Sequence, residues 1–319
     1  MNGRGVREVR ADSLPAAASL NGESFPLTTN TKPKESLDVR QYLAASLKDG
    51  WKRFRKRLRS CQRDFSEKAV HDSRVESRRL LSTLELLGAL LPDRQVAKAR
   101  RNLKRYLDTF DELRDTHVQL ILIETRIRKF PELQSFHDAL CNLERRCIKE
   151  TARRIKRTRL TQLRRSVREL EAELRHPPRR AARRQLGSED ILRALHTAFA
   201  RVVELNGRVE SSDTDTIHRV RVAFKKYRYM LEAVGSLLPG VTPRKLEAMK
   251  KFQALMGELQ DIEVLLRTVD RFTRKEKIDA SVARNFHDEL VRRSQRLIAL
   301  YLKQAGKLDR FWPLTASPG

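Results

Sequence analysis

Apolar and charged residues recur at helical spacing between residues 71 and 92, in the stretch HDSRVESRRLLSTLELLGALLP. In an α-helix, residues three or four apart lie on the same face. One face of this segment carries four leucines, Leu80, Leu84, Leu87 and Leu91. The opposite face carries His71, Arg74 and Arg78. The pattern predicts an amphipathic helix that packs its leucines into a core and carries a cationic stripe on its other side.

The same pattern occurs a second time, from residue 218 to 239, as HRVRVAFKKYRYMLEAVGSLLP. At an offset of 147, the stripe residues pair as His71 with His218, Arg74 with Arg221 and Arg78 with Lys225. A second signature, ELRD at 112–115 and ELQD at 258–261, follows each copy in the same order. The chain is therefore predicted to contain two copies of one helical unit.

Further helices are predicted around these two segments. In the first half they start after Pro33 and pass through residue 59, carry an apolar stripe over 103–113, and run from 131 toward 175. In the second half they cover about 188–210, 214–238, 243–273 and 277–307. Leu, Arg, Glu, Ala and Lys dominate while Gly and Pro are sparse, which favours an all-α fold of helical bundles.

Shifts in composition divide the chain into five parts. They are a mobile N-terminal tail at 1–35, a first helical half at 36–176, a linker at 177–187, a second half at 188–307 and a C-terminal tail at 308–319. The linker is marked by its Pro pair and polar bias, and Phe311 and Trp312 in the last part are apolar enough to pack back onto the bundle.

The charge balance of the chain indicates what kind of partner it binds. Lys and Arg total 68 against 41 Asp and Glu, a net charge of +27, and residues 145–184 alone hold 16 basic and 4 acidic residues. Charge of this size attracts polyanions and opposes self-association. We therefore expect a polyanionic partner, and a solvated face alone does not account for the 145–184 cluster.

Cysteine usage and hydropathy bear on the compartment. The three cysteines, Cys61, Cys141 and Cys147, have no metal-type spacing, and an odd number argues against a disulfide framework. No apolar run approaches the ~20 residues of a membrane span, and the N-terminal segment lacks a convincing export signal. We expect a cytoplasmic protein without a membrane partner.

Two copies of HxxRVxx(R/K)(R/K), each followed by ELxDxxV, resemble the CHAD family, which is named for its histidine-bearing α-helical domain. The resemblance covers about residues 36–307, and the Glu-x-Glu-x-Lys strand of the CYTH domain, a frequent companion, is not found. It implies two four-helix bundles related by pseudo-twofold symmetry that flank a basic central cavity or groove. It also implies non-catalytic binding of inorganic polyphosphate, with targeting to polyphosphate granules.

The resemblance carries over to nine residues: His71, Arg74, Arg78, Arg79, His218, Arg221, Lys225, Lys226 and Arg228. Arginine can hold two phosphate oxygens at once, whereas lysine acts as a mobile point charge. Four more cations either extend this path or lie on solvated helix faces: Lys104, Arg105, Lys250 and Lys251. The copies differ at Leu81, which aligns with Arg228, and at Asp111, which aligns with Gly257.

Two kinds of residue keep alternative interpretations. His71 and His218 either donate hydrogen bonds to phosphate, more strongly when protonated, or fix the geometry of the bundle. Asp115 and Asp261 either orient arginines of the His helices or form structural salt bridges. No second ligand stands four residues from either His, so a metal site is not expected.

Two other functions compete with polyphosphate binding. A nucleic-acid-binding protein would use the same basic surface, but aromatic residues make up only 6% of the chain and no stacking platform is evident. A phosphohydrolase or phosphotransferase would need a Gly-rich phosphate loop or carboxylates that hold Mg²⁺, and neither motif is found. We therefore expect no enzyme and no cofactor, and rank nucleic acid as the second choice of partner.

Overall fold

The computed structural model describes residues 38–91, 93–158, 160–179, 185–238, 240–274 and 280–312. Within these ranges the chain forms helices and turns and no strand, so the all-α prediction is confirmed. The first-half α-helices are α1 (Val39–Asp64), α2 (Glu67–Leu90), α3 (Arg94–Asp108), α4 (Asp111–Ile127), α5 (Gln134–Arg157) and α6 (Leu160–Arg175). The second-half α-helices are α8 (Ser188–Asn206), α9 (Thr214–Val234), α10 (Pro243–Thr273) and α11 (Ala280–Ala305). Three short 3-10 helices are η1 (Pro131–Leu133), η2 (Gly235–Leu237) and η3 (Leu308–Phe311).

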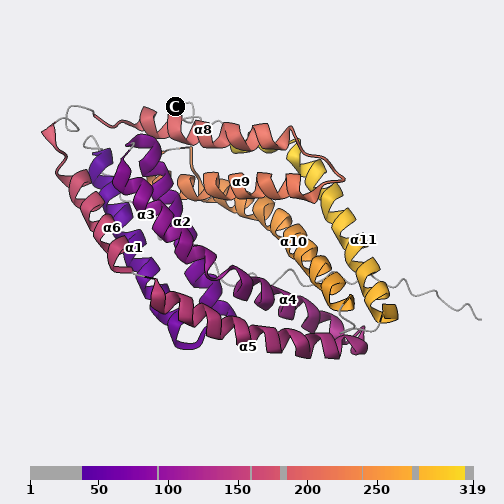
Figure 1. Ribbon diagram of the computed structural model, residues 1–319. Coiled ribbons are helices and arrows are strands. Elements are labelled where there is room, and N and C mark those ends of the chain that lie inside the picture. The colour runs from indigo at the N-terminus through magenta and orange to yellow at the C-terminus, as the bar shows by residue number, and fades with distance from the viewer. Residues whose placement is uncertain are drawn as a thin grey trace, which may run out of the picture. The chain divides into compact units, whose positions relative to one another are not determined.

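The His-bearing helices α2 and α9 pack against each other, and α2 also contacts α1, α3, α4 and α8 (Figure 1). Leu80, Leu84 and Leu87 of α2 are fully buried, as its leucine stripe predicts. Small polar residues of α2 are buried as well, and the Ser77 hydroxyl donates to the Ser73 carbonyl oxygen at 2.7 Å. A helix with neighbours on several sides buries more than the single face that its amphipathic pattern indicates.

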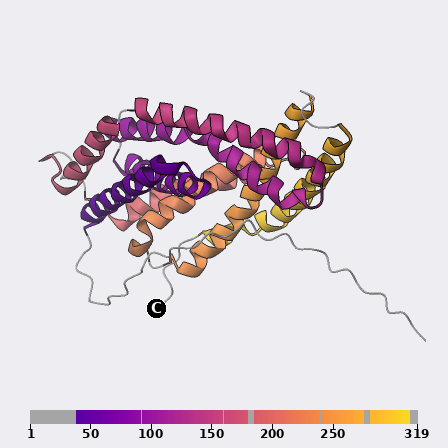
Figure 2. The ribbon, with the colours of Figure 1, turned by 90° about the horizontal axis from the view of Figure 1, so that it is seen from below.

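The helices pack in groups within each half, and two of these groups meet across the boundary between the halves. α1, α2, α3 and α6 pack together, while α4 lies beside α5, α8 beside α9 and α10 beside α11 (Figures 1 and 2). The α4–α5 pair of the first half meets the α10–α11 pair of the second, where Phe136 and Phe272 ring centroids lie 5.0 Å apart. Residues 36–319 accordingly form one compact unit.

The helices that carry the two repeated motifs follow each other in the same order in the two halves. α2 begins at Glu67 and α9 at Thr214, which keeps the offset of 147 found in the sequence. The segment α3–α4 of the first half corresponds to the single helix α10 of the second. The pseudo-twofold relation and the division into two four-helix bundles stay predictions.

Two breaks interrupt helices where the sequence pattern indicates continuity. α3 ends at Asp108. The hydroxyl of the next residue, Thr109, donates to the Tyr106 carbonyl oxygen at 2.6 Å, and the buried Phe110 precedes α4. The predicted element over 131–175 is divided at Thr158, whose backbone is extended and whose hydroxyl donates to the Arg154 carbonyl oxygen at 2.9 Å. Threonine hydroxyls compete for helix carbonyls, and apolar periodicity does not register this competition.

The last described residues pack on α8, α9 and α10. Phe311 is buried, and its carbonyl oxygen accepts a hydrogen bond from the Tyr227 hydroxyl at 3.0 Å. Trp312 stacks on Phe199 with ring centroids 5.9 Å apart. The predicted N-terminal tail at 1–35, residues 180–184 of the predicted linker and residues 313–319 lie outside the described residues.

Candidate functional site

The cationic stripes of α2 and α9 come together where these two helices pack. We call the following six residues the inner cluster: His71, Arg74 and Arg78 from α2, and His218, Arg221 and Lys225 from α9. Burial lowers the pKa of Lys225 well below its ordinary value, and the positive charges of Arg78, Arg221 and Arg74 lower it further. Burial also lowers the pKa of Arg78, with Arg74 and Arg221 adding to the effect. Cations of both helices therefore act directly on each other.

Three cations of the inner cluster lack a partner. Within the described residues, no hydrogen bond or ion pair involves the side chains of Arg78, Arg221 or Lys225, and the Nε of Arg221 is buried without an acceptor. All three side chains keep partial contact with solvent. A charge that is largely removed from water and left unpaired is unfavourable. An anion bound at this site would therefore stabilise the three side chains.

The repeat-related residues Arg74 and Arg221 differ in their neighbours. The Nη1 of Arg74 donates to the Asp111 carboxylate at 2.6 Å and to the Leu107 carbonyl oxygen at 3.3 Å. At the position equivalent to Asp111, the second half has Gly257, and a Cβ built there would lie 4.0 Å from the Arg221 Nε. The first-half arginine is thus neutralised by a carboxylate that its counterpart lacks.

Two carboxylates from the ELxD signatures lie in the field of the cluster. Burial raises the pKa of Asp261 to about 6, although the Arg221 guanidinium opposes the shift. Burial likewise raises the pKa of Asp115, with Arg74 acting against it. Neither carboxylate forms an ion pair with any described residue. Both alternatives from the sequence, direct orientation of an arginine and a structural salt bridge, thus lack a contact in the described part of the chain.

The two histidines have equivalent neighbours in the two halves. Burial lowers the pKa of His71 and the Arg114 guanidinium lowers it further. Burial lowers the pKa of His218 as well; Arg221 adds to this, while a hydrogen bond with Gln260 opposes it. Arg114 and Gln260 occupy the third position of ELRD and ELQD, so each histidine faces the variable residue of its own signature. Since the ordinary pKa is 6.5, both imidazoles are neutral at pH 7.

Arg114 is a member of the site that the sequence analysis did not name. It forms an ion pair with Glu67, and its charge acts on both His71 and Asp261. The position of Arg114 inside the ELRD signature could have identified it. The second copy has Gln260 at the equivalent position, so the comparison of the two copies did not mark this position as cationic.

Arg79 and Arg228 lie in an ion-pair network and not in the inner cluster. Arg79 pairs with Glu76 at 2.7 Å and with Glu232 at 3.8 Å. Arg228, which is 4% exposed, pairs with the same Glu232 and donates from Nε to the Gln253 Oε1 at 2.9 Å. Burial acts to lower the pKa of Arg79, but the two glutamates outweigh this effect and the pKa is raised. These arginines join α2 to α9 and α10.

The other predicted cations lie farther out. Lys226 is exposed and its Nζ lies 3.7 Å from the Glu85 carboxylate. Exposed cations of α3 and α10 complete the set: Lys104, Arg105, Lys250 and Lys251. Lys104 lies at the edge of the inner cluster, because its charge and those of Arg74 and Arg78 all act on Asp108. Lys250 pairs with Glu247 at 3.6 Å, as expected of a solvated helix face.

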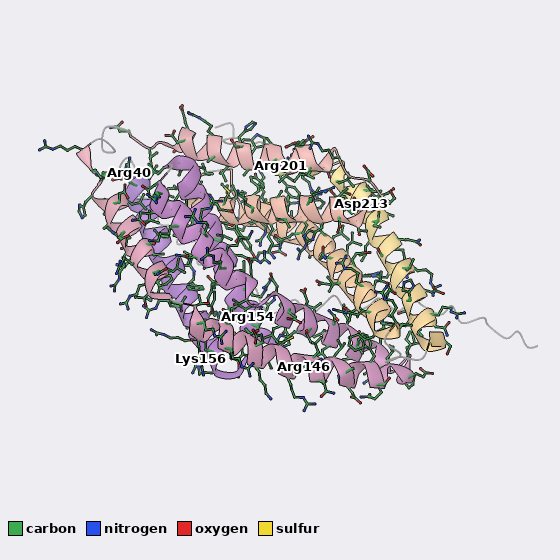
Figure 3. All side chains as sticks on the ribbon, viewed as in Figure 1. Arg40, Arg146, Arg154, Lys156, Arg201 and Asp213 are labelled. Carbon is green, nitrogen blue, oxygen red and sulfur yellow. The ribbon has the colours of Figure 1, made fainter. Side chains whose placement is uncertain are left out.

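The basic segment over 145–184 contains the second half of α5 and all of α6 in the described ranges. Arg146, Arg154 and Lys156 follow each other along α5 (Figure 3). Glu150 pairs with Arg153 at 3.8 Å and with Arg154 at 2.8 Å, which neutralises only part of the charge. The segment lies apart from the line along which α2 and α9 pack, which we call the α2–α9 seam.

No group of three or more His, Cys, Asp or Glu side chains that could hold a metal ion is present in the described part of the chain. Among the same residues, no helix has the length and hydropathy needed to cross a bilayer.

The fold and the site define an all-α protein that gathers cations from two equivalent helices. Comparison with known families matches residues 41–270 to the CHAD domain, and the chain belongs to this family. Among solved structures, the crystal structure of the CHAD domain from the plant Ricinus communis matches with a TM-score of 0.69 and 17% identity. That match covers 88% of this chain and 96% of the plant chain, and it supports the fold. A comparison with curated proteins gives no match.

Proposed function

We propose that this CHAD protein binds inorganic polyphosphate through the inner cluster without catalysing a reaction on it, in the cytoplasm and at polyphosphate granules. The observation that carries the proposal is the gathering of Arg78, Arg221 and Lys225 without a carboxylate partner. A polyphosphate chain supplies closely spaced negative charges along its length. It would therefore neutralise cations from α2 and α9 together, which one small anion would not.

The chemistry of the side chains fits phosphate as the ligand. Arg78 and Arg221 offer planar forks of donors for phosphate oxygens, and Lys225 offers a compact charge. His71 and His218 are neutral at pH 7, so each can donate one hydrogen bond to a phosphate oxygen without adding charge. The inner cluster gathers cations, and the described residues contain no group of three or more His, Cys, Asp or Glu side chains that would hold a metal ion, which favours binding over catalysis.

The experiment is a competition at fixed salt between long-chain polyphosphate and duplex DNA for the full chain. We expect polyphosphate to displace DNA, and a variant with glutamine at Arg74, Arg78, Arg221 and Lys225 to bind polyphosphate much more weakly while it keeps its helical circular dichroism. Preferential binding of DNA would make nucleic acid the ligand and would contradict the proposal. Unchanged binding by the quadruple variant would move the site to the 145–184 segment.

The absence of catalysis has its own test. The protein is incubated with polyphosphate and Mg²⁺ or Mn²⁺, and free phosphate and chain length are followed over time. We expect no change in either quantity. Release of phosphate that disappears in the quadruple variant would identify the inner cluster as a catalytic site.

A further inference from the structure

A second group of unpaired cations lies on the seam between α1 and α6. We call Arg55 and Arg59 of α1 with Arg164 and Arg168 of α6 the outer arginine face. Each pair is spaced by four residues, so its two side chains point the same way from their helix. Arg59, Arg164 and Arg168 are exposed and Arg55 is partly exposed.

Contacts on either side of these arginines fix the register of the two helices. Lys48 of α1 pairs with Glu171 of α6 at 3.9 Å, and the Gln41 side-chain Nε2 donates to the Arg175 carbonyl oxygen at 3.4 Å. The higher-numbered residue of α6 meets the lower-numbered residue of α1, so the helices run antiparallel. This register brings Arg55 level with Arg164, and Arg59 and Arg168 lie about one turn to either side.

The four guanidinium groups repel one another and have no counter-charge. Burial lowers the pKa of Arg55, and the positive charges of Arg59, Arg164 and Arg168 lower it further. In the described residues, no hydrogen bond or ion pair involves any of the four side chains. By contrast, Arg53 and Arg57, on the side of α1 that faces α2, are paired with Glu76 at 3.3 Å and Asp72 at 3.4 Å. Arginines on the α2 side of α1 thus have acidic partners, whereas no carboxylate of a described residue pairs with the four arginines of the outer arginine face.

The surroundings of this surface favour a ligand that is recognised through phosphate groups alone. The Trp51 ring packs toward the core, 5.4 Å from the buried Phe54, and offers no platform for a nucleobase. Proteins that hold single-stranded nucleic acid usually stack bases on such rings. Four exposed arginines can instead grip successive phosphates of a flexible polyanion.

We propose that the outer arginine face is a second polyphosphate-binding site, so that one protein molecule bridges two polyphosphate chains. The inference rests on the function proposed for the inner cluster. The outer arginines are on the α1–α6 seam, whereas the inner cluster is on the α2–α9 seam, and the helices α1 and α2 with their packed side chains stand between them. Two sites on separate seams can hold separate chains and gather polyphosphate into a condensed body.

A sandwich assay tests this inference with the full chain. Short polyphosphate is attached to a surface by one end, the protein is bound at low density, and fluorescently labelled polyphosphate is then added. The wild type should retain the labelled chain. A variant carrying Arg55→Gln, Arg59→Gln, Arg164→Gln and Arg168→Gln should bind the immobilised chain with unchanged affinity and retain label only at the level without protein.

A matched control removes four exposed arginines elsewhere, by Arg128→Gln, Arg244→Gln, Arg284→Gln and Arg296→Gln. It loses the same net charge and should retain label like the wild type. Equal loss of label in the control would overturn the inference, because net charge would then explain the result. If the outer variant does not keep its helical circular dichroism, Arg164→Gln with Arg168→Gln alone gives the same reading.

The outcomes separate the two proposals. A wild type that does not bind the immobilised chain contradicts the function proposed for the inner cluster. A wild type that binds, together with an outer variant that retains label fully, contradicts only the bridging role. Labelled duplex DNA, added in place of labelled polyphosphate, tests nucleic acid as the ligand of the outer arginine face. If the bound protein retained DNA in preference to polyphosphate, the outer arginine face would be a nucleic-acid site.

Discussion

The Arg221 guanidinium lies against Gly257, at the place where its repeat counterpart Arg74 meets the Asp111 carboxylate. The two halves therefore contribute unequal charge to the inner cluster. Arg74 is paired at 2.6 Å, while Arg221 has no partner among the described residues. Substitutions at positions 111 and 257 can therefore test the role of each arginine separately from the effect of the protein's total charge.

Exchange of these two positions should move affinity in opposite directions. Gly257→Asp places a carboxylate beside Arg221 and is expected to weaken polyphosphate binding on the order of tenfold, the effect of about 1.4 kcal/mol. Asp111→Gly releases Arg74 and should strengthen binding. Titration of labelled polyphosphate at fixed salt measures both. Gly257→Asn serves as the control, because its side chain matches aspartate in size and carries no charge; weakening by asparagine equal to that by aspartate would rule out the electrostatic explanation.

Binding should tighten as the pH falls from 7.5 toward 5. Asp261 has a pKa of about 6 and loses its negative charge over this interval, which leaves Arg221 and Lys225 to the ligand. Asp261→Asn should bind more tightly than the wild type at pH 7.5 and show a flatter pH profile. Asp49→Asn, an exposed change with the same loss of charge, should leave the profile as it is. A profile in Asp261→Asn as steep as in the wild type would exclude Asp261 as its source.

The same carboxyl should make the free protein less stable as pH rises. Its pKa is raised from the ordinary value of 3.8 to about 6, so the folded state holds this proton over an interval in which the unfolded chain releases it. The free energy of unfolding should therefore decline between about pH 4 and pH 6, by on the order of 2 kcal/mol from this group. Urea unfolding of wild type and Asp261→Asn at pH 4 and pH 7 measures the difference. Equal declines in the two proteins would contradict the assignment.

Lys225→Met should stabilise the free protein and weaken its binding. Burial and the neighbouring arginines lower the pKa of Lys225, so its charged form costs folding free energy at neutral pH. Methionine has a similar length and removes that cost, and we expect a gain on the order of 1 kcal/mol. Thermal unfolding and polyphosphate titration check the two effects. Lys226→Met, at a neighbouring exposed position, should change neither by as much, and a loss of stability in Lys225→Met would contradict the interpretation.

Arg228→Met should destabilise the fold without altering the affinity of the molecules that remain folded. Arg228 is buried and pairs with Glu232, which lies 3.8 Å from the Arg79 Nε as well. Loss of one partner leaves a largely buried glutamate incompletely neutralised, at a cost of about 3 kcal/mol. Urea unfolding should show this loss, and titration at low temperature should show wild-type affinity. A binding defect without destabilisation would return Arg228 to the ligand site.

Much of the site could be predicted from the sequence because it is repeated. The HxxRV pattern gives the helix face of His71, Arg74 and Arg78, and its second copy gives the equivalent face of α9. Helical periodicity fixes the direction of side chains within one helix. Of the leucines predicted for the core, Leu80, Leu84 and Leu87 are buried and Leu91 is partly buried, and the all-α class follows from the same pattern.

The tertiary structure decided which cations have partners. Arg78 and Arg79 are adjacent in the sequence and equally basic, yet Arg79 pairs with Glu76 and Glu232 while Arg78 faces Arg221. The distinction depends on α9 packing against α2, and periodicity within one segment carries no information on its neighbours. For the same reason the outer arginine face emerged only from the antiparallel packing of α1 on α6. The sequence by itself determined the helices and the charge they carry; the packing of those helices determined which charges are left for a ligand, because ion pairing depends on distances across helices that are far apart in the chain.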